Sequence, residues 1–173
     1  MDQTKVSLRS VARALSDVVA PAVDPHNAQA QEQLRLAIDC IEFVAGRVDH
    51  LYDRERFELR QHLAMGSALL AVAGASASSE FQSLSGAVQA GQDALNRAPA
   101  LPHLREAGAA LAESVCAFIC AASALPEPVR AQVERTVIHA SKPRIEFERS
   151  WYAPLGFNPD EADVKPLAEV LQL

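Results

Sequence analysis

The sequence has few aromatic residues and few cysteines. Aromatic side chains make up only 5% of its 173 residues, and there are three cysteines. Three cysteines are too few for a disulfide scaffold, so we expect an apolar core to hold the fold together. The apolar fraction of 49% excludes a disordered chain. A chain of this length suits one sizeable core and is short for two, so we predict a single domain over residues 1–173.

Motifs for the common enzyme and metal chemistries are missing as well. There is no G-x-G or G-K-[ST] pattern for phosphate binding, no H-E-x-x-H for zinc and no G-x-S-x-G for a serine nucleophile. No glutamate has a histidine three residues later, which excludes the paired Glu-x-x-His ligands of di-iron helix bundles. We therefore favour a protein that is not an enzyme, and we assign it no catalytic residue, no cofactor and no metal ligand.

The balance of charge argues against a nucleic-acid partner. Sixteen basic and 22 acidic side chains give a formal net charge of −6, and no run of four Lys or Arg occurs. Binding to nucleic acid without sequence preference needs a basic face. The longest uncharged run, residues 61–79, is too weakly apolar to span a membrane, and the first residues lack the apolar core of a signal peptide. These features, together with the cysteines, predict a cytoplasmic protein that binds neither nucleic acid nor membranes.

What the chain has in abundance is alanine, with 32 residues of the best helix former. Apolar residues recur at helical spacing along most of its length, which predicts an all-α bundle of six or seven helices. Pro21 ends the first helix, and Asp24-Pro25 starts the second. A single helix over residues 26–76 would be about 75 Å long, whereas a compact domain of this size has a radius of gyration of about 16 Å. We therefore expect a break near residues 50–56, although one long bent helix is the alternative.

The second half of the chain is expected to hold the central helix and a C-terminal arm. Ser78 or Ser79 is a candidate cap for a helix over residues 80–97. The second half of the helix over 103–125, from Cys116 to Leu125, is apolar on every side except at Ser123, so we predict that this helix is central and that Cys116 and Cys120 are buried. Lys142-Pro143 is expected to break or kink the next helix and to begin an arm, from about residue 143, that an aromatic cluster anchors. The cluster is Phe147, Trp151, Tyr152 and Phe157, and a short last helix starts at residues 158–161.

One polar group could hold a ligand. His62 falls on the apolar side of its helix with Glu58 one turn earlier, and a partly buried histidine beside a carboxylate can act as a base or a ligand. Arg56 is the nearest candidate for a third member. A histidine hydrogen-bonded at a helix interface is the plainer explanation, and the mixed charges of residues 47–60 are typical of a solvated face that includes His50.

The most unusual feature is a shortage of charge in the middle of the chain. Residues 61–104 contain only Glu80, Asp93 and Arg97 as charged residues, whereas the first 60 residues contain 18. Either these helices are buried, or their outer side is a plain uncharged polar surface, or part of that surface meets another protein. The small residues of this stretch allow helices to approach closely, which favours a homodimer or a protein partner.

The N-terminal third also resembles a known group of proteins. The residues that carry the resemblance are Leu8-Arg9-Ser10-Val11-Ala12-Arg13, Val19-Ala20-Pro21, Asp24-Pro25, Gln33-Leu34 and Val44-Ala45-Gly46-Arg47-Val48-Asp49. They are similar to segments of small bacterial all-helical proteins of unknown function, whose genes accompany aminoglycoside-phosphotransferase-like and acyl-CoA-dehydrogenase-like enzymes. The resemblance implies a bacterial protein with an accessory role beside an enzyme, and it supplies no catalytic residues.

These observations lead to two functional hypotheses. The first is a non-catalytic interaction or accessory protein that self-associates through the low-charge helical surface of residues 61–104. The alternative is a protein or enzyme that binds an anionic or acyl small molecule between helices near His62.

Overall fold

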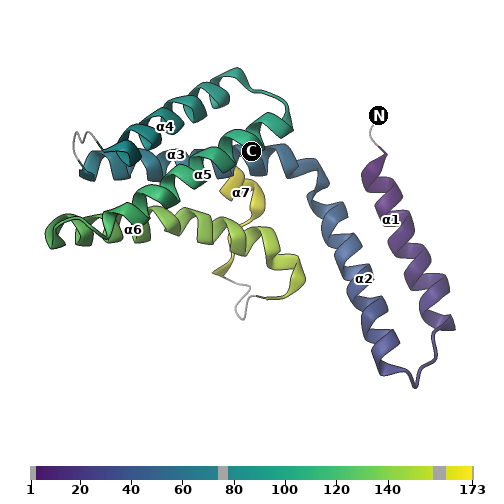
Figure 1. Cartoon of the computed structure of the whole chain (residues 1–173). Coiled ribbons are helices and arrows are strands. Elements are labelled where there is room, and N and C mark those ends of the chain that lie inside the picture. Colours follow the sequence, from purple (N-terminus) through teal and green to yellow (C-terminus); the bar gives the residue numbers. More distant parts are fainter. Residues whose placement is uncertain (1–2, 74–77, 158–162, 173) are drawn as a thin grey trace. The chain divides into compact units, whose positions relative to one another are not determined.

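The computed structural model describes residues 3–73, 78–157 and 163–172, and these segments are almost entirely helical. The helices labelled α1 to α7 agree with the six or seven expected, and no strand occurs in the described segments (Figure 1). The all-α prediction is confirmed. None of the described helices is long and apolar enough to cross a membrane.

The chain divides into two compact units. Unit 1 comprises residues 1–51 and 152–159, and unit 2 comprises residues 52–151 and 160–173. A division by contacts does not test whether the two units fold together, so the single domain over residues 1–173 stays a prediction.

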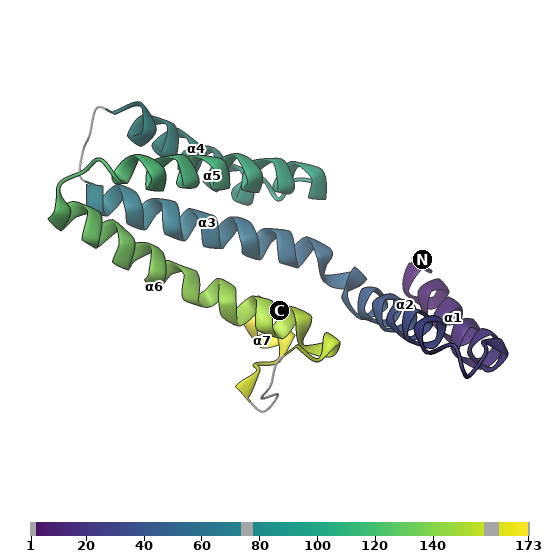
Figure 2. The same cartoon turned by 60° about the horizontal axis from the view of Figure 1, so that its bottom comes forward.

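Unit 1 is a pair of antiparallel helices. Helix α1 (Thr4–Ala14) continues into a π-helical turn (Leu15–Val19) and a 3-10 turn (Ala20–Ala22), and α2 (Ala28–Arg47) returns beside α1 (Figures 1 and 2). Lys5 Nζ lies 2.6 Å from Asp49 Oδ2 and so ties the start of α1 to the residues that follow α2. The predicted start of α2 at Asp24-Pro25 is three residues too early. Asn27 caps the helix by accepting a hydrogen bond from the Ala30 amide.

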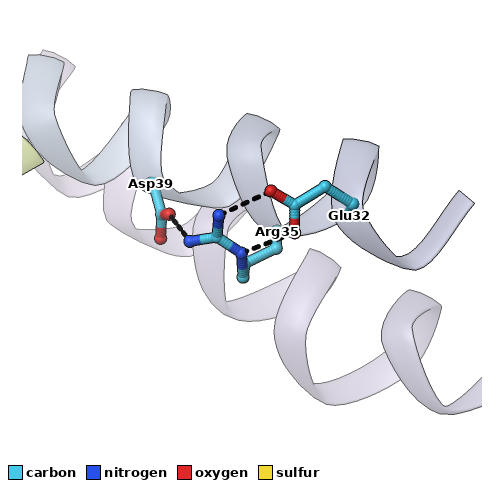
Figure 3. A network of polar contacts seen from close by, with 3 residues as sticks. All are labelled: Glu32, Arg35 and Asp39. Carbon is cyan, nitrogen blue, oxygen red and sulfur yellow. Dashed lines mark hydrogen bonds and ion pairs between the residues drawn. The ribbon is translucent and has the colours of Figure 1, made fainter. Parts of the chain in front are cut away.

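Helix α2 is solvated on its outer side and carries an aromatic contact near its end. Arg35 bridges Glu32 and Asp39 on the surface, with nitrogen–oxygen distances of 2.7 and 2.8 Å (Figure 3). Such exposed pairs add little stability. Phe43 stacks on Tyr152 with ring centroids 5.8 Å apart, and so holds the 3-10 turn Ala153–Leu155 within unit 1.

The expected break between two long helices is present, slightly earlier than predicted. A 3-10 turn (Val48–His50) separates α2 from α3 (Leu51–Ala73). The charged residues 53–56, where the break was expected, lie inside α3, because Glu and Arg are good helix formers. His50 is partly buried rather than solvated. It lies in the 3-10 turn, where positions extrapolated at the α-helical angle no longer hold.

Unit 2 is built on leucines from three neighbouring helices. Helix α4 (Ser79–Arg97) is capped by Ser78, as predicted, and lies beside α5 (Leu101–Ala122) in both views (Figures 1 and 2). The core contains ten buried residues, namely Leu59, Leu63, Leu69, Leu84, Leu104, Leu111, Val115, Phe118, Ala122 and Val133. Gly66 and Gly91 are buried where a side chain would meet this core, so part of the low-charge stretch is explained by burial.

Two predictions about unit 2 are wrong. Helix α6 (Glu127–Tyr152) does not break at Lys142-Pro143 but continues through Pro143, while a kink at this position stays a prediction. Proline leaves the carbonyl of His139 without its helical partner, but both residues are exposed, so water can satisfy that group. Cys116 and Cys120 are exposed rather than buried. The packed side of α5 consists of Leu111 and the buried residues that recur every three or four positions along the helix. The two cysteines lie on the other side of α5.

The C-terminal part of unit 2 is held largely as expected. Phe147 and Trp151 are buried, and Phe57 stacks on Phe147 with centroids 4.4 Å apart. The buried Ser150 hydroxyl donates to the Lys165 carbonyl at 2.8 Å, and helix α7 (Leu167–Leu171) buries Leu171. Phe157 is 76% exposed and takes no part in the buried cluster. The helix start predicted at residues 158–161 lies outside the described residues.

Candidate functional site: a groove between α3 and α5

Glu58 and His62 come together in one groove. They lie one turn apart on α3, and both line a concavity of about 310 Å³ whose other wall is α5. Its α5 wall includes Gly108, Ala109 and Ala112. Small side chains on this wall leave the space open, since a methyl group added at Gly108 would meet nothing within 4 Å.

His62 is the least satisfied polar group of the groove. Its Nδ1 atom is buried and has no hydrogen-bond partner. Burial lowers the pKa of the His62 imidazole, and the positive charge of Arg144 lowers this pKa further. The ring is therefore neutral at pH 7, and a neutral imidazole can accept or donate one hydrogen bond at its free nitrogen.

Glu58 is engaged by a residue that is distant in sequence. Arg144 Nε lies 3.7 Å from Glu58 Oε2 and 3.2 Å from Glu148 Oε1. The Glu58 side chain is only 16% exposed. Arg144 thus pairs with the Glu58 carboxylate, while its positive charge disfavours a charged His62.

Arg56 does not join this group. It is two positions from Glu58, which on a helix places it about 160° away, and it does not line the groove. Its Nε atom is buried without a hydrogen-bond partner. Of the predicted candidates, the structure therefore brings together Glu58 and His62 and leaves Arg56 elsewhere.

Two other arginines line the groove, and neither is free. Arg105 Nε lies 2.8 Å from Glu55 Oε1, which ties α5 to α3. The Arg54 guanidinium lies over the Trp151 ring, 4.9 Å from its centroid. No local pattern in the sequence points to Arg105 or Arg144, because they are 50 and 86 positions away from their α3 partners.

The groove is balanced in charge. Its lining includes two arginines and two glutamates. No cluster of three or more metal-binding side chains is found among the described residues. Chemically, the site offers hydrogen bonding to a neutral imidazole beside a carboxylate.

Comparison with known proteins adds no relative. No protein family, no curated protein and no solved structure matches the chain.

Proposed function

We propose that this chain is a non-catalytic interaction or accessory protein of the bacterial cytoplasm, and that it self-associates through the low-charge surface of residues 61–104. The observation that carries the proposal is the presence of only three charged residues in this stretch. A surface without charges can be dehydrated by a partner at low cost. Three exposed, unpaired cysteines support a reducing compartment.

Helix α4 supplies a large share of the exposed part of this surface. Five of its exposed residues are uncharged and adjoin one another on one side of the helix, namely Gln82, Ser83, Gly86, Gln89 and Ala90. A methyl group at Gly86 would meet no atom within 4 Å, so another backbone could approach closely there. We call these five residues the α4 face.

Sedimentation velocity over a wide range of concentrations tests the proposal. We expect the wild type to sediment above the monomer mass at high micromolar concentration. Ala90→Lys, which places a charge in the α4 face, is expected to reduce that mass. Ala110→Lys is the matched control, because Ala110 is an exposed alanine on the outer side of α5. A monomeric wild type, or equal masses for the two variants, would contradict the proposal.

A second function is favoured by the unpaired nitrogen of His62. We propose, as the alternative, that the groove between α3 and α5 binds a small anionic or acyl molecule whose polar end bonds to His62 Nδ1. The test is thermal denaturation with short-chain carboxylates and with inorganic phosphate. We expect a stabilisation that His62→Gln abolishes and Arg56→Gln retains. If none of these compounds raises the melting temperature of the wild type, this alternative is contradicted.

A further inference from the structure

The helical hairpin of unit 1 leaves several apolar side chains exposed. Val11 is 49% and Val44 is 42% exposed, while the fully buried residues of α1 and α2 are two alanines, Ala12 and Ala45. Alanine buries little area, and larger apolar residues such as Ile38 are only partly buried, so the hairpin has a small core of its own. Its remaining apolar surface is stabilised only if something else covers it.

Val11 and Val44 lie on one side of the hairpin. On a helix, Val11 is about 160° from Arg9, and Val44 is about 160° from Glu42. Arg9 and Glu42 line the same groove between α1 and α2. Both valines therefore lie together on the opposite side of the hairpin.

Small uncharged residues complete this side. Ala14, Ala37 and Cys40 are exposed and lie within about 60° of the two valines on their helices. The Lys5–Asp49 ion pair sets the register of the hairpin. Because the two helices rise by about the same distance per residue, this register places Val11 level with Val44. We call Val11, Ala14, Ala37, Cys40 and Val44 the valine face.

Most charged residues of the hairpin are turned elsewhere. Arg9, Arg13 and Glu42 line the groove on the opposite side. Arg47 lies at the edge of the face, about 60° from Val44, and its guanidinium is placed over the Phe43 ring, 5.8 Å from the centroid. On α2, the three-residue network of Figure 3 lies on the outer surface, where its members pair with one another. The valine face is therefore uncharged, and an uncharged apolar face is complementary to itself, as a two-fold symmetric interface requires.

The dimensions of the face suit a second copy. Helix α2 has 20 residues and is about 30 Å long. Two helices, each about 10 Å across, present about 600 Å² per hairpin, or about 1,200 Å² in all, which reaches the lower end of stable specific interfaces. We infer that the valine face binds the same face of a second copy of this chain, so that the two hairpins form a four-helix bundle. The inference goes beyond the proposed function, because this surface lies outside residues 61–104.

Charged substitutions on and off the face test the inference by sedimentation velocity. Val11→Asp with Val44→Asp should lower the sedimenting mass, because it would bury four carboxylates in the symmetric interface. Val6→Asp is the matched control, since Val6 is 64% exposed on α1 and about 140° from Val11. An unchanged mass for the double variant overturns the inference and leaves the α4 face as the interface. A monomeric wild type at high concentration overturns it as well.

The thiol of Cys40 gives a second readout that does not depend on the valine variants folding. In a Cys116→Ser/Cys120→Ser background, Cys40 is the only thiol. We expect its reaction with a maleimide to slow as the protein is concentrated, and Ala90→Lys to leave that protection in place. A rate independent of concentration would mean that unit 2 or nothing covers the face, and it would refute the inference. Loss of protection on Ala90→Lys would instead assign dimerisation to the α4 face.

Discussion

At the residue scale, glycine decides how closely the helices of unit 2 approach. A methyl group at Gly66 would lie 2.8 Å from Val88 Cγ2, whereas one at Gly86 would meet nothing within 4 Å. We expect Gly66→Ala to be less stable than Gly86→Ala by about 1–3 kcal/mol, because both gain the same helix propensity and only the first is overpacked. Urea denaturation of the two variants measures the difference. Equal free energies of unfolding would mean that Val88 moves aside freely.

His62 should make stability depend on pH. Its pKa is lowered in the folded state, so the unfolded chain binds the proton more readily. The stabilisation from the neutral ring is complete above the unfolded pKa of about 6.5 and is lost as the pH falls through the folded pKa. We therefore expect His62→Gln to lose less thermal stability than the wild type when the pH is lowered from 7.5 to 5.

A comparison variant identifies the source of that pH dependence. His26 is exposed in the turn before α2, so His26→Gln should follow the wild-type profile. Parallel profiles for the wild type and His62→Gln would show that other groups cause the acid sensitivity.

Among the candidate residues, the sequence could predict only local neighbours. Glu58 and His62 are four positions apart on one helix, so their proximity follows from helical geometry alone. The contacts of Arg144 and Arg105 depend on how α5 and α6 pack against α3, and no local pattern contains that information. The exposure of Cys116 and Cys120 has the same origin, since an apolar helix does not reveal which of its sides is covered.

At the scale of the element, Pro143 is a defect that α6 tolerates. It lies in the helix interior at an exposed position, where it removes a hydrogen bond. We expect Pro143→Ala to raise the free energy of unfolding by about 1–3 kcal/mol. Pro128→Ala is the control, because Pro128 lies in the first turn of α6, where proline is well accommodated. A stability gain that is no larger for Pro143→Ala than for the control would contradict this account.

The helix ends that were predicted correctly carry local signals. Ser78 caps α4 through the amide of Phe81, an interaction between residues three apart. The start of α2 was misplaced because two capping residues stand close together. Asp24 accepts a hydrogen bond from the His26 amide within the turn, and Asn27 caps the helix instead.

At the scale of the whole molecule, the two units differ in how much they bury. Among the residues described, α1 and α2 bury only alanines, while α3, α4 and α5 share a core of leucines. We expect the amides of α1 and α2 to exchange hydrogen faster than those of α3 and α5 in dilute protein. Exchange measured by mass spectrometry should show this order, and equal protection in both units would contradict it.

Concentration should alter that pattern if the hairpin has a partner. Covering the valine face would slow exchange in α1 and α2 as the protein is concentrated. The peptides of α5 serve as the internal control, because their packing is already complete within unit 2.

The sequence by itself determined the helical class, most helix boundaries, and the proximity of Glu58 and His62. Each of these depends on residues within about one turn of one another, where periodicity, caps and prolines act directly. Only the tertiary structure decided which sides of the helices are covered. It exposed both cysteines of α5, carried α6 through Pro143, joined Arg144 to Glu58, and left the valine face of the hairpin open. The physical reason is that burial and long-range ion pairs depend on the packing of segments distant in sequence, which local patterns do not encode.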